Sequence, residues 1–376
     1  MRTDIGYVGA KLSAGTAGQI PSYRASVKSV SGGVCLKLLK ICIAALLCIL
    51  LSGCVWIIEE PIPTVSGEGL WVHYLDVGQA DCALLKCDGE YILIDGGNVE
   101  DSNLVVSYLE QSGVEELKAV ICTHAHEDHV GGLPGVLAVF PTEAVYAPTR
   151  TYASDCFDDF VYYTDQQGLN ITIPEVGDTI SFGQADAKVL GPVKTYAETN
   201  NTSLILMVTY GENRFLFTGD METDAEADLL ESGADLKADV LKVGHHGSET
   251  STSYRFLYEI APEHAVISVG TDNHYDHPSS QVLSRLQDAD AAIYRTDRLG
   301  TVIAHTDGTQ ITVTWETDAQ PQLPSGEGTV YIGNKKSKTL HTEGCSSLPS
   351  ESNQVFFEDP DEALNAGYKL CSRCME

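Results

Sequence analysis

Residues 123–132 constrain this chain most strongly, because they read Thr-His-Ala-His-Glu-Asp-His-Val-Gly-Gly and follow an apolar run at 119–122. Such a run predicts a buried strand that opens into a polar loop. Four side chains of the loop can bind metal, namely those of His124, His126, Asp128 and His129. Imidazole and carboxylate ligands suit Zn²⁺, Mn²⁺ or Fe, whereas a solvated polar turn would not need three histidines. We therefore expect a metal centre at this loop.

The same loop can serve two ions. His124 and His126 can face one site while Asp128 and His129 face a neighbouring one. Two ions roughly 3.5–4 Å apart would activate a water and hold a phosphoryl or acyl oxygen. The pattern therefore favours a hydrolytic centre.

Further candidate ligands follow later apolar strands. Asp220 follows the apolar run 215–218 of a predicted strand, where a buried carboxylate is costly unless it binds a cation. His245 and His246 follow the strand predicted at 240–243. Adjacent histidines would be unremarkable on a surface loop, but at this edge of the fold we expect at least one to be a ligand.

His277 lies in the sequence Tyr-Asp-His-Pro, after the next strand and before a helix. It is either the last ligand of the second site or a proton donor to the leaving group, which imidazole can be near neutral pH. A turn that caps the helix is the structural alternative. Our candidate catalytic residues are Asp128, His246 and His277, whereas His73, His264 and His305 are interpreted as packing residues.

The pattern of the remaining chain alternates between strands and helices. The predicted strands are 70–75, 82–85, 91–94, 119–122, 202–210, 214–218, 240–243 and 265–269, and the predicted helices are 104–111, 132–140, 156–167, 224–232 and 280–286. A last hairpin turns at residues 307–308. This order predicts an α/β fold in which two mixed sheets lie face to face with helices outside. We expect no disulfide framework.

These motifs resemble the metallo-β-lactamase superfamily, whose hallmark is His-x-His-x-Asp-His, over about residues 70–314. Residues 73–81, 94–97, 218–220 and 242–248 are similar to the lactamase-fold domain of ComEC-type DNA-uptake proteins and to its secreted phosphodiesterase-type relatives. The resemblance implies an αββα sandwich with two divalent ions, zinc or manganese, bridged by Asp220. Asp76 and Asp95 lie in Gly-containing turns of this pattern, where such acids hold loops or orient a ligand histidine.

The chain departs from many members of that superfamily at one point. They supply a third histidine to the first site before the strand that leads to the bridging aspartate, and this chain has Thr-Asn-Asn-Thr-Ser at 199–203. The departure leaves manganese open at that site and weakens a β-lactamase interpretation. Asn200 or Asn201 is a candidate contact to substrate or to a metal-bound water.

The N-terminal part reads as an export segment. Basic residues precede an uncharged apolar run at 41–51, which ends in Leu-Ser-Gly-Cys at Cys54 and resembles a bacterial lipobox. We expect residues 34–54 to be a signal peptide with lipidation at Cys54, and residues 1–33 to be an over-long start. A plain signal anchor is the alternative. Residues 55–68 would be a linker, and the protein would lie outside the cytoplasm, anchored by lipid to the bacterial membrane.

The hydrolase domain is predicted at 69–318, followed by a linker at 319–327 and a small module at 328–376. The module carries four candidate zinc ligands, His341, Cys345, Cys371 and Cys374. Two ligand pairs at this spacing, in a segment too small for a core of its own, predict one structural zinc ion, with a redox pair as the alternative. The module resembles the zinc-binding module of Ada-type sensors, with a histidine at one cysteine position.

Charge narrows the choice of partners. From Cys54 onward the chain has 17 basic and 52 acidic residues, a field that repels polyanions at long range. The expected function is that of a phosphodiesterase or nuclease related to DNA uptake, which acts on a phosphodiester such as single-stranded DNA. We expect the protein to be a monomer with a DNA-uptake machinery as its partner. The alternatives are a hydrolase of small phosphocholine-type or teichoic-type esters of the envelope, and a non-catalytic surface binding module stabilised by metal.

Overall fold

The computed structural model describes residues 67–324, 330–342, 345–357 and 360–375. The predicted leader, the lipidation site Cys54 and most of the first linker lie outside these residues. Among the described helices, none has the length and apolar character needed to cross a membrane.

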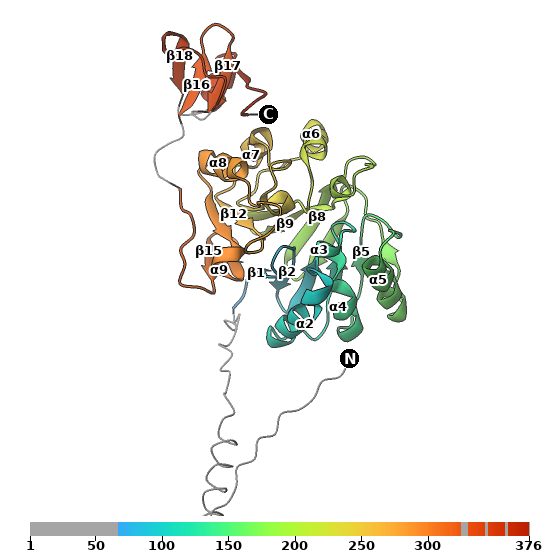
Figure 1. The fold of residues 1–376 in the computed structure, drawn as a ribbon. Helices are drawn as coiled ribbons and strands as arrows, with labels where there is room; N and C mark the ends of the chain where they lie inside the picture. Colours follow the sequence, from blue (N-terminus) through green and yellow to red (C-terminus); the bar gives the residue numbers. More distant parts are fainter. Residues whose placement is uncertain (1–66, 325–329, 343–344, 358–359, 376) are drawn as a thin grey trace, which may run out of the picture. The chain divides into compact units, whose positions relative to one another are not determined.

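The first sheet contains eight strands in the order β15-β14-β1-β2-β3-β4-β5-β6. Figure 1 labels β15, β1, β2 and β5 of this sheet. Their bounds are β1 Leu70–Tyr74, β2 Ala83–Cys87, β3 Glu90–Ile94, β4 Ala119–Ile121, β5 Val145–Tyr146, β6 Ile171–Thr172, β14 Val302–Thr306 and β15 Ile311–Trp315. Strands β15 to β3 pair antiparallel, and β3 to β6 pair parallel. The carboxyl ends of β3 and β4 therefore meet at one edge.

The second sheet has seven strands in the order β13-β12-β11-β10-β9-β8-β7. Their bounds are β7 Thr179–Phe182, β8 Ala185–Gly191, β9 Ile205–Tyr210, β10 Asn213–Phe217, β11 Val240–Lys242, β12 His264–Ile267 and β13 Ala292–Arg295. Strands β10, β11, β12 and β13 run parallel. Four consecutive strands thus deliver their following loops to the same end of this sheet.

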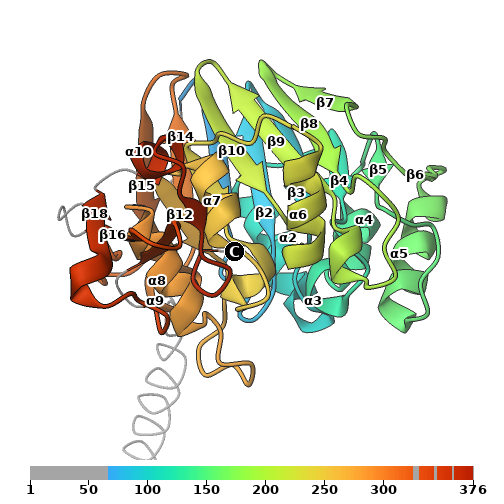
Figure 2. The ribbon, with the colours of Figure 1, turned by 90° about the horizontal axis from the view of Figure 1, so that it is seen from above.

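The two sheets face each other across an apolar core. Side chains alternate along the strands, so that Val72 and Leu85 of the first sheet share one cluster with Val208 and Phe215 of the second. Figure 2 shows the two sheets layered with helices on both outer faces. The expected α/β sandwich is confirmed.

Helices cover the outer faces through two further apolar clusters. On the first sheet lie α2 Ser102–Gln111, α4 Leu133–Val139 and α5 Asp155–Gln166, and on the second lie α6 Thr223–Glu231, α7 Tyr254–Ile260 and α8 Ser280–Asp288. Serine side chains begin three of them: Ser154 accepts from the amide of Phe157, Ser253 from that of Phe256, and Ser279 from that of Val282. Two short helices, α3 Glu127–Val130 and α9 Thr296–Leu299, lie in loops.

Several elements were not expected from the sequence. Strands β5 to β8, strand β13 and helix α7 are absent from the predicted set. Strand β8 begins Ala-Asp-Ala-Lys, residues that favour strands weakly, and α7 has only 7 residues. Gln322, in the predicted second linker, pairs with Ile293 and so extends the edge of the second sheet.

The C-terminal module has its own four-stranded sheet in the order β18-β16-β17-β19. Its elements are β16 Tyr331–Asn334, β17 Thr339–Thr342, β18 Gln354–Phe357, α10 Pro360–Asn365 and β19 Lys369–Leu370. A few buried side chains, including Leu340, Phe357 and Ala363, form its small core. So small a core is consistent with a module that needs additional stabilisation, such as a bound metal ion.

Candidate metal centre

The candidate ligands lie in loops that follow parallel strands of both sheets. Strand β4 leads into the loop of His124 to His129, β10 is followed by Asp220, and β11 is followed by the 3-10 turn η3 Gly244–Gly247. His126 precedes the first turn of α3 with extended backbone angles, so the chain changes direction within the motif. Two separate sheets therefore contribute to one centre.

Close packing of backbone holds the motif loop in place. A Cβ on Gly132 would collide with the carbonyl oxygen of Gly96, and the amide of Gly96 donates to the carbonyl of His129 at 2.7 Å. Only glycine permits this approach between the loops that follow β3 and β4. The glycines after the motif thus have a steric role.

Asp128, His129, Asp220 and His246 form a compact cluster whose ligand atoms all lie within 4.8 Å of one another. His129 Nε2 lies 3.2 Å from Asp220 Oδ1, and His246 Nε2 lies 3.3 Å from Asp128 Oδ2 and 3.6 Å from Asp220 Oδ2. Ligand atoms around a tetrahedral zinc are about 3.3 Å apart, given bonds of about 2.0–2.1 Å. The four side chains fit a divalent cation.

Two atoms of this cluster, Nε2 of His129 and Oδ1 of Asp220, are buried with no hydrogen-bond partner besides each other, at 3.2 Å. Buried polar atoms are ordinarily paired. Their convergence is explained if both are metal ligands.

Each of the two histidines of this cluster is held through its other nitrogen. His129 Nδ1 donates to Asp95 Oδ2 at 2.8 Å, and Asp95 also accepts from the amide of Thr123 at 2.7 Å. His246 Nδ1 donates to the carbonyl of Ser268 at 3.0 Å. Such contacts fix the tautomer and turn Nε2 toward a metal. Asp95 thus orients a ligand, whereas Asp76 caps its turn by accepting from the amide of Gly78 at 3.2 Å.

The electrostatics of the cluster call for positive charge. Burial alone would lower the pKa of His129, but Asp220, Asp95 and Asp128 raise it well above its usual value. Burial also opposes charge on Asp220, yet His129 and His246 hold the pKa of that carboxyl well below its usual range. For His246 the carboxylates of Asp220 and Asp81 outweigh burial and raise the pKa to about 10. A divalent cation, if bound here, would supply the positive charge that these carboxylates attract.

His124 and His126 begin a second group beside this cluster. His124 Nε2 lies 3.1 Å from His126 Nδ1 and 3.9 Å from Asp220 Oδ2. Burial lowers the pKa of His124 well below its usual value, so its imidazole is neutral and able to bind metal. Asp220 therefore lies between the two groups, as expected of a bridging ligand.

His277 lines the same cleft but is not part of the compact cluster. Its ring centre lies 5.6 Å from that of His245, and its Nδ1 lies 3.5 Å from Gln79 Nε2. Burial, followed by His245 and His246, lowers its pKa to about 4. Because the Gln79 amide group faces Nδ1, the ring can direct an Nε2–H donor into the cleft.

The cleft over the centre has a volume of about 1190 Å³. Asp76, Glu100, Asp101 and Glu127 line it together with the metal-binding residues, and the described lining residues include no lysine or arginine. The wall is therefore acidic apart from what the ions contribute.

Sequence reasoning missed three side chains at the centre. Asp81 Oδ1 lies 3.3 Å from His246 Nδ1, Lys242 pairs with Asp81, and Glu222 Oε1 lies 3.4 Å from His245 Nδ1. The available signals were a charge within an apolar strand at Lys242 and the acid that follows the bridging aspartate by two residues. Neither signal tells which residue of a distant loop the side chain contacts.

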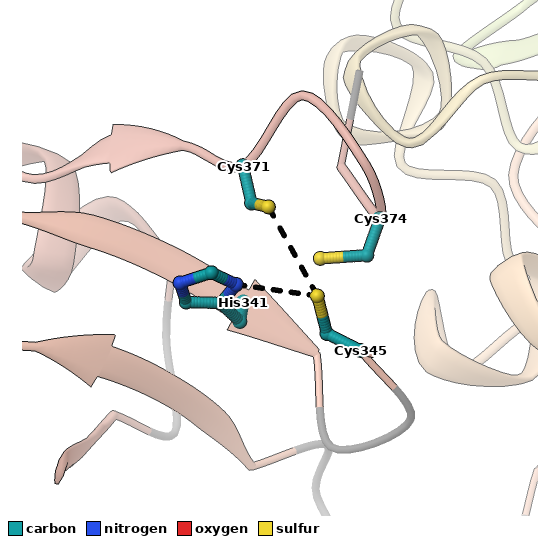
Figure 3. Close-up of side chains that lie close together, drawn as sticks. All are labelled: His341, Cys345, Cys371 and Cys374. Atoms are coloured by element: carbon teal, nitrogen blue, oxygen red, sulfur yellow. Dashed lines mark hydrogen bonds between the residues drawn. The ribbon is translucent and has the colours of Figure 1, made fainter. Parts of the chain in front are cut away.

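The C-terminal module brings together the four residues predicted for zinc. Figure 3 shows His341, Cys345, Cys371 and Cys374 converging from strand β17 and the adjoining loops. His341 Nδ1 lies 3.3 Å from Cys345 Sγ, which lies 4.0 Å from Cys371 Sγ. Thiolates about 2.3 Å from a tetrahedral zinc would be roughly 3.8 Å apart, so the set fits zinc. All seven cysteines in the described part of the chain are free thiols.

Comparison with known proteins finds two families. Residues 75–271 match the family described as the metallo-beta-lactamase superfamily, and residues 319–376 match the metal binding domain of Ada. The ComE operon protein 3 of Bacillus subtilis (strain 168) is 31% identical over 260 residues, 64% of this chain and 33% of that protein. The competence protein ComA of Neisseria gonorrhoeae is 29% identical over 255 residues, 67% of this chain and 34% of that protein.

This chain thus spans about a third of the length of these curated relatives. Among solved structures, the metallo-beta-lactamase fold protein YhfI from Bacillus subtilis is 13% identical, with a TM-score of 0.45 over 64% of this chain and 100% of that one.

Proposed function

Because the chain belongs to the metallo-beta-lactamase superfamily of metal-dependent hydrolases, we propose that it is a two-metal phosphodiesterase that cleaves single-stranded DNA. The observation that carries the proposal is the position of Asp220 between two ligand groups at the floor of an open cleft. Two divalent ions, when bound, supply Lewis-acid activation of a water for in-line attack on a phosphodiester.

The residues of the chain then have distinct tasks. Asp128, His129, Asp220 and His246 would hold one ion, and His124 and His126 with Asp220 would hold the other. Asp95 keeps the His129 ring in the orientation that presents Nε2. His277 donates a hydrogen bond from Nε2–H to the oxygen of the departing alcohol. In the C-terminal module, the Cys₃His set holds one structural zinc ion.

Two considerations support a phosphodiester substrate. Two curated relatives are named for the ComE operon and for competence, and residues 199–203 lack the histidine that many other members carry at that point. Imidazole and carboxylate donors suit manganese as well as zinc. We place the protein outside the cytoplasm, held by lipid at Cys54, where a DNA-uptake machinery would be its partner.

The acidic wall of the cleft favours a second candidate, a small phosphoester of the cell envelope. Carboxylates at Asp76, Glu100, Asp101 and Glu127 surround the approach to the ions. Such a wall repels a polyanion more than a single diester group. A phosphocholine-type or teichoic-type ester would meet less repulsion.

The test is hydrolysis by the purified protein, loaded with Mn²⁺ or Zn²⁺, of bis-p-nitrophenyl phosphate and of labelled single-stranded DNA. We expect cleavage of both, lost in His126→Ala and retained in the matched control His264→Ala. Cleavage of the small diester alone would select the envelope ester. No turnover of either substrate with both ions bound would contradict phosphodiesterase activity.

The Asp220→Asn variant distinguishes an enzyme from a binding module that is merely stabilised by metal. An enzyme loses turnover in this variant while the fold persists, as judged by circular dichroism. A binding module shows no turnover in the parent protein either.

A further inference from the structure

The first metal site receives two imidazoles from the motif loop. His124 and His126 reach it, and Asp220 is shared, but residues 199–203 contain no histidine. A nitrogen donor from another loop, close to the Asp220 oxygen that faces His124, would complete the site.

His245 is that donor by position. Its Nε2 lies 3.7 Å from Asp220 Oδ2, the oxygen that also lies 3.9 Å from His124 Nε2 and 3.6 Å from His246 Nε2. These separations are close to the roughly 3.3 Å expected between ligands of one ion, and they leave room for a small contraction on binding. His245 is only partly exposed, at 21% of its side chain, and it lines the cleft.

The backbone separates His245 from His246. Both residues have left-handed angles, with φ of 49° and 51°, although neither is glycine. Such angles are uncommon and cost energy, and they persist where the surroundings demand them. Their ring centres lie 6.3 Å apart with planes at 65°, so one ring approaches Asp220 beside Glu222 and the other beside Asp128.

The second nitrogen of His245 is held as in the other ligand histidines. Nδ1 lies 3.4 Å from Glu222 Oε1 and 3.4 Å from the hydroxyl of Thr250. A carboxylate only accepts hydrogen bonds, so the proton of the neutral ring lies on Nδ1 and the lone pair lies on Nε2. Glu222 also accepts from Thr250 at 3.1 Å and from Asn200 Nδ2 at 3.3 Å, which fixes the carboxylate itself.

We propose that His245 supplies the third imidazole of the first metal site, and that Glu222 is the residue that positions it. The adjacent histidines are thus divided between the two ions, His245 to the first and His246 to the second. The proposal rests on the two-metal part of the proposed function and is independent of the substrate.

Asn200 provides the competing assignment. Its Oδ1 is buried without a hydrogen-bond partner and its Nδ2 faces Glu222 and His245. If the amide oxygen were the third ligand, Asn200→Ala rather than a change at His245 would empty the first site.

The experiment counts ions by ¹¹³Cd NMR and by metal analysis of the full-length protein. The parent is expected to give two resonances from nitrogen and oxygen sites and one from the thiolate site of the C-terminal module. His245→Gly, which also relieves the left-handed backbone, is expected to lose one nitrogen and oxygen resonance. Free imidazole should restore it. His245→Asn serves as a second variant, because asparagine tolerates left-handed angles.

Matched variants isolate the role of each neighbour. Glu222→Gln is expected to retain both ions with affinity for one of them reduced by about 10–100-fold, and His264→Ala should match the parent. The proposal is overturned if both resonances persist in His245→Gly, if Asn200→Ala alone loses one, or if the parent holds a single ion outside the module. Failure to cleave any diester while these counts hold would refute the proposed function and leave His245 assigned.

Discussion

Lys242 and Asp81 form an ion pair in the interior, with Nζ 2.8 Å from Oδ2 and both side chains almost fully buried. Lys242 also donates to the carbonyl of Val243 at 3.0 Å. The other oxygen of Asp81 lies 3.3 Å from His246 Nδ1. The pair therefore determines the charge next to Nδ1 of His246, a candidate ligand.

Replacing Lys242 by methionine should destabilise the fold strongly. Asp81 would remain as a buried carboxylate without its partner, and we expect the free energy of unfolding to fall by about 3–5 kcal/mol. Urea denaturation measures the change, with the exposed Lys188→Met as control. Asp81→Asn combined with Lys242→Met should recover part of the loss, because no unpaired charge is then left. A Lys242→Met protein as stable as the control would show that the pair is dispensable.

Replacing Asp95 by asparagine should weaken the second metal site without unfolding the protein. The asparagine amide can turn its NH₂ group toward His129 Nδ1, and the tautomer with the proton on Nδ1 is then no longer favoured. We therefore expect affinity for the ion to fall by about 10–100-fold. Competition with a chromogenic chelator measures this. The exposed Asp186→Asn is the matched control, and equal affinities in both variants would count against an orienting role for Asp95.

His73 should make stability depend on pH. Burial, aided by Lys86, lowers its pKa from 6.5 to about 4, and its Nδ1 lies 2.7 Å from the hydroxyl of Tyr108. Below pH 6.5 the unfolded state takes up a proton that the folded state refuses, so stability is lost as pH falls from 6.5 to about 4. The slope attributable to this residue approaches about 1.4 kcal/mol per pH unit.

The measurement is urea unfolding of the parent and of His73→Gln across this pH range. The stability difference between parent and variant should shrink as pH falls. A difference that stays constant from about pH 6.5 to 4 would mean that His73 titrates alike in both states.

Loss of one thiolate should release the ion of the C-terminal module alone. Cys374→Ala leaves three of the four ligands, and we expect one zinc equivalent fewer by metal analysis with the hydrolase centre still loaded. Cys156→Ala, which changes a half-buried thiol away from the module, is the control. Full zinc content in Cys374→Ala would remove that residue from the ligand set.

The sequence predicted local features well and distant pairings poorly. The spacing from His124 to His129 indicated the ligand loop, because four donors in six residues have few other uses. Asp220 was predicted as a ligand because an acid that ends a buried strand needs a cation. Asp81 and Glu222 were missed because their roles depend on contacts with His246 and His245. These histidines come from other loops, so the local sequence does not indicate the contacts. Lys242 was missed because a lysine in a strand is expected at the surface.

The same distinction applies to the fold. Strands β9 and β10 were predicted with small errors at their ends, since apolar runs flank a clear turn at Gly211. The hairpin of β7 and β8 was not predicted, because alanine, aspartate and lysine fill much of β8 and only pairing with β9 makes it a strand.

The ligands of the centre come from loops of both sheets, with His129 and Asp128 following β4 and Asp220 and His246 following β10 and β11. Neither half of the chain holds a complete set, so an ion gains its full binding free energy only when the halves have come together. Metal binding would then be coupled to the correct packing of the two sheets. A chain in which one sheet is misfolded would therefore bind the ion more weakly than the folded protein.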